Sequence, residues 1–369
     1  MKKVLSINLL LFLAIFLFEC KPKKDKDPDE DPATVFDKQA MLTNYADNLI
    51  MPSYNSFKVS LDSLINVYDA FKISGSLIDL QVVKQKFQTA YIKYQRCDLF
   101  EFGPAETHII RSSLNVFPTD SVQINSNIAL GTYNLSVIAN LDAKGFPALE
   151  FLFYGNGASE NSILGLFSNT NRKQYVSDLL TEMSTKINSV VSSWSSSYRN
   201  TFINSLNTDV GSSIGFLVNQ LNFQLDYLKN AKIGIPLGKK SLGVAVPTSC
   251  EAYYTAYSVS YAKETLNLIE NAYLGRSVSG SNGKGFDDYL AHLDAKYNGG
   301  SLNDAINTQF AIAKTKLSAV PDPLSTQVTA NAAVVDAAYV ELVKLLVLLK
   351  TDMPSSLGVV ITYQDGDGD

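Results

Sequence analysis

The sequence contains very little histidine and has no strong excess of either charge. Its 369 residues include two histidines, three cysteines and one tryptophan. A zinc site built from several histidines is therefore excluded by count. Its 31 basic and 36 acidic residues give a formal net charge of −5, so the basic face typical of nucleic-acid binding is not expected. The sequence also contains no phosphate-binding P-loop.

Long apolar runs are scarce as well. The main one, Leu9 to Phe18, follows a short basic start and ends shortly before Cys20. It is too short to span a bilayer, and it is typical of the apolar region of a signal peptide. We predict that residues 1–20 form a lipoprotein signal peptide with Cys20 as the lipidation site, although Glu19 stands where a small residue is usual. An ordinary secretory signal and an uncleaved anchor are the alternatives.

The segment after Cys20 consists almost entirely of charged residues and proline. It reads KPKKDKDPDEDP and offers no apolar side chain to bury. Such a composition predicts that residues 21–33 form a disordered tether between a lipid and a folded body. Acidic residues soon after the cysteine resemble export signals of some bacterial lipoproteins, which favours the cell envelope and the outer membrane as the location.

Two further cysteines, Cys97 and Cys250, lie far apart in the chain and form no C-x-x-C pattern. An oxidising envelope permits a long-range disulfide between them. We favour two buried free thiols, and the sequence leaves the pairing open.

From residue 34 onward apolar residues recur every three or four positions, which predicts helices nearly throughout. The expected fold is all-α, with two helical-bundle domains and little or no strand. We place the domains at residues 34–160 and 161–369. Three local predictions follow from the pattern: a helix that stops at Pro52, one long helix from Cys250 to Leu274, and one short extended piece in LGVVITYQ, residues 357–364.

The stretch KGFPALEFLFYG, residues 144–155, is apolar except for one acid, Glu150, three positions after Pro147. Residues at this spacing share one face of a helix, and a histidine with a glutamate there can ligate one metal ion, as in di-iron bundles. Proline has no side-chain donor, so half of such a chelate is missing. A carboxylate in apolar surroundings must still be paired, hydrogen-bonded or neutralised. Either a ligand meets Glu150, or an arginine or helix N-termini satisfy it.

This stretch resembles the G-x-H-x-x-E region of the imelysin family, with Gly145 and Glu150 kept and Pro147 in the position of the histidine. Four other stretches are similar to the family as well. They are FEFGPAE with NVFPTD, the later CEAYYTAYSVSYAKETLNLIENAYLG, and the closing LKTDMPSSLGVVITYQDGDGD. The resemblance extends from Phe36 to Asp369.

The resemblance implies an envelope protein with two helical domains and a site where the domains meet. The family is named as a metallopeptidase and is also tied to iron uptake. We assign no catalytic residue. Glu150 is the candidate metal ligand, and the candidate ligand-binding residues are Phe102, Gly103, Pro104, His108, Arg111, Gly145, Pro147, Glu150, Glu251, Tyr257 and Ser258.

The expected function is a non-catalytic binding protein for the uptake of iron, another divalent metal or a small ligand. Its expected partners are the membrane, through the N-terminal lipid, and iron-uptake components, but not nucleic acid. One alternative is a metallopeptidase of the imelysin type. A zinc peptidase needs about three protein ligands, whereas His108 and His292 lie outside any H-E-x-x-H motif. The other alternative is an outer-membrane interaction or scaffold protein.

Overall fold

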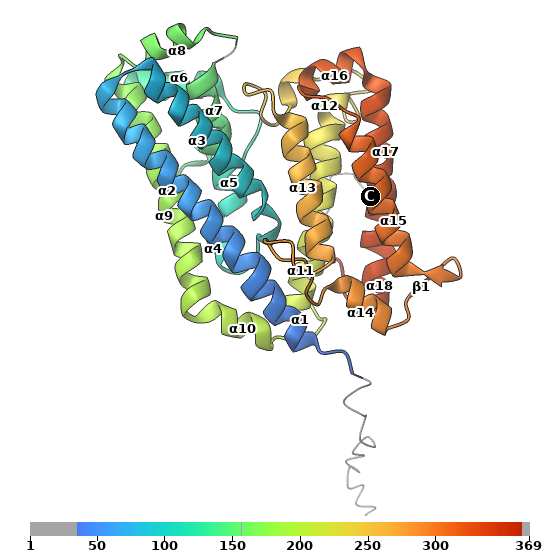
Figure 1. Ribbon diagram of the computed structural model, residues 1–369. Coiled ribbons are helices and arrows are strands. Elements are labelled where there is room, and N and C mark those ends of the chain that lie inside the picture. The colour runs from blue at the N-terminus through green and yellow to red at the C-terminus, as the bar shows by residue number, and fades with distance from the viewer. Residues whose placement is uncertain (1–34, 156, 364–369) are drawn as a thin grey trace, which may run out of the picture. The chain divides into compact units, whose positions relative to one another are not determined.

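Helices form nearly all the regular structure of residues 35–155 and 157–363, which the computed structural model describes (Figure 1). The all-α fold predicted from the sequence is confirmed. The α-helices are α1 (Lys38–Asn44), α2 (Met51–Ser74), α3 (Leu77–Gln95), α4 (Pro104–Thr107), α5 (Ile110–Leu114), α6 (Ser121–Leu130), α7 (Gly145–Tyr154), α8 (Glu160–Leu166), α9 (Thr170–Ser193), α10 (Arg199–Asn204), α11 (Ser213–Tyr227), α12 (Ile235–Leu237), α13 (Ser258–Tyr273), α14 (Phe286–His292), α15 (Leu302–Ser318), α16 (Leu324–Ala330), α17 (Ala332–Val347) and α18 (Met353–Leu357).

Short 3₁₀ and π-helical turns join or extend several of these helices. The 3₁₀ turns are η3 (Asp98–Phe100), η4 (Ile138–Ala143) and η7 (Pro247–Ser249), and the π turns are η2 (Tyr45–Ile50), η5 (Trp194–Tyr198), η6 (Leu228–Gly234) and η8 (Leu348–Asp352). The chain after residue 230 therefore continues as helix to Leu237.

Polar residues cap the longer helices at the positions where the chain turns into them. The side chains of Ser76, Asp120 and Asn169 accept backbone N–H groups of the first turns of α3, α6 and α9. Ser212 and Ser301 do the same for α11 and α15. These bonds satisfy donors that have no partner inside the helix.

The helix predicted to stop at Pro52 does not stop there. The π turn η2 leads directly into α2, and Pro52 occupies the first turn of that helix. A proline is tolerated in a first turn because its missing N–H would have no partner inside the helix. The sequence prediction was therefore wrong about the break, because it did not allow for a π turn.

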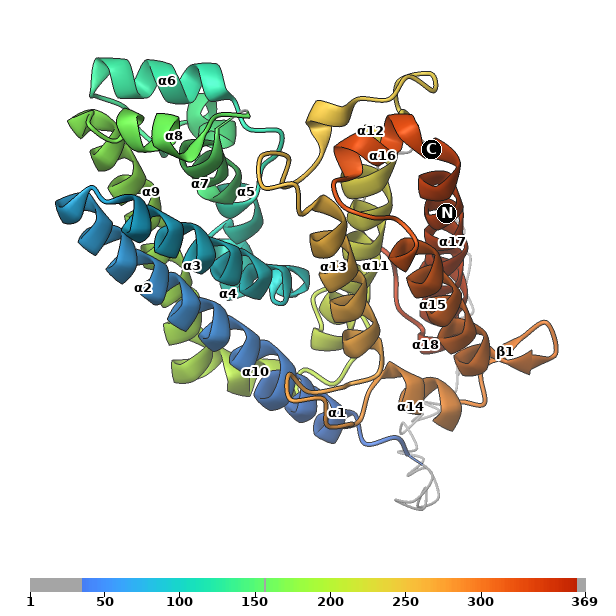
Figure 2. The same ribbon diagram turned by 45° about the horizontal axis from the view of Figure 1, so that its top comes forward.

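Within the described residues, α2 packs against α3 and α9, whereas α13 packs against α11 and α15. α15 in turn packs on α17, and α3 meets α13 (Figures 1 and 2). α9 follows the predicted domain boundary at residue 160, yet it packs against α2 and α7, which precede that boundary. The division into two domains stays a prediction.

Aromatic side chains fix the position of α7 against α2 and α3. The ring of Phe146 on α7 stacks on Tyr91, with centroids 4.4 Å apart and planes within 2° of parallel. Phe57 and Phe87 pack against the same ring from α2 and α3. Buried aromatic pairs of this kind add to the burial of apolar area, so the apolar face predicted for residues 144–155 is core.

The only strands among the described residues form a small antiparallel hairpin, β1 (Lys296–Tyr297) with β2 (Gly300–Ser301). The extended piece predicted for residues 357–364 is not a strand up to Tyr363, because α18 ends at Leu357 and the following residues pair with no other strand. In the described part of the chain, every helix is too short or too polar to cross a bilayer.

Cys97 and Cys250 are both buried free thiols, in agreement with the favoured prediction. The predicted signal peptide, Cys20 and the predicted tether lie outside the described residues.

Candidate functional site

Glu150 lies on the second turn of α7 and is 2% exposed. Its Oε1 accepts two hydrogen bonds from one residue, from Thr255 N at 2.7 Å and from Thr255 Oγ1 at 2.6 Å. Among the described residues no basic side chain forms an ion pair with it. The carboxyl is thus buried and hydrogen-bonded, but its charge is not neutralised.

Burial raises the pKa of Glu150 to about 7, against the two hydrogen bonds from Thr255, which lower it. The nearby charge of Glu251 raises it further. A carboxyl with such a pKa exchanges its proton near neutral pH. When ionised, it can therefore bind a cation. When protonated, it can donate a hydrogen bond to an acceptor.

Thr255 belongs to a segment, residues 250–257, that was predicted as helix and is not. α13 begins only at Ser258, and residues 251–256 form turns. Ala252 and Ala256 adopt left-handed conformations with φ of 53° and 64°, which cost a non-glycine residue about 1–2 kcal/mol each. These two bends on either side of Thr255 turn its backbone N–H toward Glu150, a geometry that a continuous helix would not give.

Glu251, in the same segment, is the centre of a fully buried polar network. Its Oε1 accepts from Gln95 Nε2 at 2.7 Å and from Asn115 Nδ2 at 2.8 Å. Lys232 Nζ lies 2.9 Å from its other oxygen and also donates to Gln95 and Thr265. Charges buried this deeply persist only when they are paired and hydrogen-bonded, and here both conditions are met.

Two tyrosines lie between the acids. The ring of Tyr91 packs against that of Tyr261, with centroids 4.6 Å apart, and the Tyr91 hydroxyl contacts Asn115 and Glu251. The charges of Glu150 and Glu251 both act on Tyr261 and, together with burial, raise its pKa. The Tyr261 hydroxyl is buried and has no hydrogen-bond partner among the described residues.

A second buried network is centred on Arg111. Its Nε donates to Asp98 Oδ1 at 3.0 Å, and Gln224 and Tyr94 donate to the same carboxylate. Burial alone would raise the pKa of Asp98, but the charges of Arg111 and Lys232 and the hydrogen bonds from Gln224 and Tyr94 together outweigh burial, and the pKa is lowered. Burial does raise the pKa of Glu101 to about 7, although the Arg111 backbone donates to it.

Four of the predicted site residues lie in a different environment. Phe102 stacks on Phe202 and Phe216, and a Cβ on Gly103 would collide with the ring of Tyr198. Pro104 begins α4, and the carbonyl of His108 accepts from Lys186. Among the described residues, none of these four forms a hydrogen bond, ion pair or ring contact with Glu150.

Gly145 and Pro147 belong to the first turn of α7, the helix that carries Glu150. Gly145 has a φ of 72°, and a Cβ there would collide with the backbone of Leu114. Pro147 is buried in the first turn of α7. Tyr257 is the residue before α13 and is exposed, whereas Ser258 is buried and its hydroxyl lowers the otherwise raised pKa of Cys250.

The structure therefore brings together Glu150 and Glu251, and adds groups that the sequence did not single out. Thr255, Lys232, Gln95 and Asn115 are the important additions. Asn115 is the first residue of NVFPTD, one of the stretches that resemble the imelysin family, so this resemblance could have identified it. In the described part of the chain, no three His, Cys, Asp or Glu side chains converge in the manner of a metal site.

A comparison with protein families decides the classification, because the model of the family described as "Imelysin" matches residues 50–349. The chain belongs to the imelysin family. The identified region includes α7, the 250–257 segment and α13, so the network around Glu150 lies in the imelysin part of the chain.

Known imelysin-like structures share this fold. A crystal structure described as an iron-regulated protein A precursor, from Parabacteroides distasonis, superposes with a TM-score of 0.73 at 16% identity, over 90% of this chain and 97% of that one. An imelysin-like protein from Psychrobacter arcticum gives 0.68 at 18% identity, over 91% and 99%. The TM-scores show that the three chains share a fold.

A curated relative is the iron-regulated protein A of Synechococcus elongatus. It is 24% identical over 122 residues, which cover 31% of this imelysin and 33% of the relative. The match thus spans about a third of that protein's length.

Proposed function

We propose that this imelysin is a non-catalytic binding protein of the cell envelope that takes part in iron acquisition. Glu150 is the group that meets the metal or the small ligand that carries it. The observation that carries the proposal is a buried carboxyl with a pKa of about 7 and no basic partner among the described residues. Ionisable groups with perturbed pKa values cluster at functional sites.

Two further observations support a site at Glu150. The segment that holds it contains two left-handed alanines, Ala252 and Ala256, and backbone strain of this kind is concentrated at ligand-binding sites. The hydroxyl of Tyr261 is buried and has no hydrogen-bond partner among the described residues. Burial and the charge of Glu150 both raise its pKa. A ligand oxygen or metal-bound water would satisfy both groups.

The name of the Synechococcus relative and that of the Parabacteroides protein supply the link to iron. Carboxylate and phenol oxygens are hard donors that suit ferric iron. Among the described residues no cluster of metal-binding side chains surrounds Glu150. Most of the ligands of the iron would therefore come from a carrier or from water.

The envelope location rests on the sequence of the first 33 residues, where a signal peptide ending at Cys20 and a charged tether are predicted. In this proposal the lipid on Cys20 anchors the protein to the outer membrane. Labelling of the expressed chain with a radioactive fatty acid, compared with Cys20→Ala, tests it. Equal labelling of the two chains would contradict the anchor.

Calorimetric titration of the full chain with ferrous iron and with a weak ferric chelate tests the function. We expect saturable binding that Glu150→Gln reduces by about tenfold or more, the scale of a lost contact to a charged group. Glu106→Gln is the matched control, because Glu106 is exposed and the chemical change is the same.

Other results of this titration, and of a peptide-cleavage assay, would support the alternative functions. Equal binding by Glu150→Gln would remove Glu150 from the site. Binding of neither form of iron would leave an interaction or scaffold protein. Chelator-sensitive cleavage of an unfolded peptide that is lost in Glu150→Gln would establish a metallopeptidase instead.

A further inference from the structure

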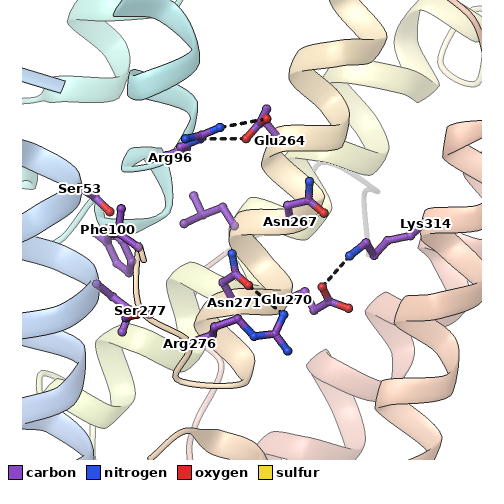
Figure 3. Close-up of a pocket in the computed structure, with 13 residues that line it drawn as sticks. Ser53, Arg96, Phe100, Glu264, Asn267, Glu270, Asn271, Arg276, Ser277 and Lys314 are labelled. Carbon is purple, nitrogen blue, oxygen red and sulfur yellow. Dashed lines mark hydrogen bonds and ion pairs between the residues drawn. The ribbon is translucent and has the colours of Figure 1, made fainter. Parts of the chain in front are cut away.

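A cavity of about 310 Å³ opens between α2 and η3 on one side and α13 and α15 on the other (Figure 3). This volume lies at the small end of the range of about 300–1,000 Å³ that ligand pockets occupy. Leu49, Phe100 and Leu268 supply apolar surface, and the remaining lining residues are mostly polar or charged. None of the lining residues belongs to the candidate site at Glu150, so the cavity is a separate feature.

One face of α13 forms the polar wall. Glu264, Asn267, Leu268 and Asn271 recur at spacings of three and four residues and therefore share this face. Figure 3 shows Asn267 and Asn271 at successive turns above and below each other. The wall thus presents two amide groups next to an apolar leucine.

Most of the charges in the cavity are paired. Arg96 Nε and NH2 donate to the two oxygens of Glu264 at 2.9 and 3.2 Å. Lys314 Nζ donates to Glu270 at 2.7 Å. These pairs connect α3 and α15 to α13, and they leave the third cation of the cavity, Arg276, in excess.

Arg276 has much of its binding capacity unused. A guanidinium has five N–H donors, and the one side-chain hydrogen bond from that of Arg276 is a long one of 3.4 Å to Asn271 Oδ1. Among the described residues no carboxylate forms an ion pair with it. Arg276 is therefore a cation at the cavity that forms no ion pair with the described residues, although its charge acts on the carboxyl of Asp287 and lowers the pKa of that group, against burial, which raises it.

Two other polar groups in the cavity have no hydrogen-bond partner in the described part of the chain. Ser53 is 4% exposed, and its hydroxyl lies on the side of α2 that faces α13 (Figure 3). The amide of Asn267 faces the same space. Both groups line the cavity, so their hydrogen-bonding capacity is open to a bound polar molecule.

The loop that carries Arg276 is held in place before any ligand arrives. Asn44 Nδ2 donates to the carbonyls of Gly275 and Lys284 at 2.7 and 2.9 Å, which closes the two ends of the loop. Its middle is attached through Val278 N, which donates to the carbonyl of Asn48 at 3.1 Å. A pre-organised cation loses less conformational entropy on binding.

We propose that this cavity binds a small organic carboxylate that also carries a hydroxyl or amide group. Arg276 receives the carboxylate, because its guanidinium matches two carboxylate oxygens. Asn267 and Ser53 bind the hydroxyl or amide, and Leu268 and Phe100 contact the carbon skeleton. This binding site goes beyond the proposed function and does not depend on Glu150.

Calorimetry of the full chain with matched probes tests the proposal. The probes are lactate and N-acetylglycine, and the controls are their uncharged amides, lactamide and N-acetylglycinamide. We expect saturable binding of at least one carboxylate and binding of its amide that is weaker by about tenfold or more, because the contact with a charged partner is lost. Absence of binding by both carboxylates, or binding of inorganic phosphate alone, would overturn the proposal.

Variants place the binding in this cavity. Arg276→Gln removes the cation, and Asn267→Trp fills the space without a change in charge. We expect each to weaken carboxylate binding by about tenfold or more. Lys296→Gln, on the exposed hairpin, removes the same charge elsewhere and should bind as the unmodified chain does.

Circular dichroism shows which variants are folded. If Arg276→Gln is misfolded, Asn267→Trp alone decides the location. Unchanged binding in the folded variants would exclude the cavity. Because Glu150→Gln should keep its carboxylate binding, a failure here is distinguishable from a failure of the iron-binding proposal.

Discussion

Lys232 and Glu251 form an ion pair in the interior, with Nζ 2.9 Å from Oε2 and each side chain 1% exposed. The pair joins η6 to the segment that carries Thr255, and Gln95 and Thr265 satisfy the remaining lysine donors. The segment beside Glu150 is therefore attached to the core through a charge that has no access to water. Its stability depends on both partners.

Removal of one partner should be strongly destabilising. We expect Lys232→Met to lower the free energy of unfolding by about 3–5 kcal/mol, because it leaves Glu251 buried and unpaired. Urea denaturation measures this. Lys296→Met breaks the exposed pair with Asp294 and should change stability by less than about 1 kcal/mol. Equal effects of the two changes would contradict a buried, dry ion pair.

The raised pKa of Glu150 predicts a specific dependence of stability on pH. The folded state holds the proton more tightly than the unfolded chain, so its contribution is present below the ordinary pKa of 4.5 and is lost as pH rises toward 7. The loss amounts to at most about 3 kcal/mol. Glu150→Gln cannot ionise, so its stability should fall less over this interval when unfolding is measured at pH 4, 5, 6, 7 and 8.

A matched control for this pH series is Glu106→Gln, at an exposed acid. Its profile should follow that of the unmodified chain. Identical slopes for Glu150→Gln and the unmodified chain would show that Glu150 titrates normally.

The left-handed alanines near Glu150 should respond favourably to glycine. We expect Ala256→Gly to be neutral or stabilising by up to about 1 kcal/mol, because glycine adopts a φ of 64° without steric cost. Ala311→Gly, in the middle of α15, should instead destabilise by about 1 kcal/mol. Thermal unfolding of both variants gives the comparison. A loss at Ala256 as large as that at Ala311 would argue against strain in this segment.

Gly145 should not tolerate a side chain. Gly145→Ala combines an unfavourable φ with a collision against the backbone of Leu114, so a loss of more than about 1 kcal/mol is expected. Gly211→Ala has the unfavourable φ but open space around it, and Gly165→Ala has neither problem. Chemical denaturation should therefore rank the losses in the order Gly145, Gly211, Gly165, and any other order would contradict the role of close packing.

Periodicity in the sequence predicted most helices because their apolar faces are long and regular. In α15, for example, Leu302, Ile306, Phe310, Ala313 and Leu317 recur every three or four positions and are all buried. The errors arose where local geometry overrides periodicity. The π turn before Pro52 keeps the helix continuous, and the bends at Ala252 and Ala256 interrupt a segment whose composition is helical.

The site was predictable only in part, for a similar reason. An acid in an apolar helix indicated that Glu150 would be buried and would need partners. Its actual partner, Thr255, comes from a distant segment and donates through both its backbone N–H and its hydroxyl. The turns that bring Thr255 to Glu150 leave no regular pattern in the sequence. Lys232 as the counter-ion of Glu251 likewise depends on how η6 packs against α13.

α13 adjoins the Glu150 site at one end and lines the cavity further along. Its first residues adjoin the segment that holds Glu150, whereas Glu264, Asn267 and Asn271 form the wall of the cavity further along. Sixteen helical residues span about 24 Å and move as a nearly rigid rod. A substitution within α13 that rotates or slides this rod at one end also shifts the groups at the other, so such a substitution affects both places, whereas Glu150→Gln, outside α13, affects one.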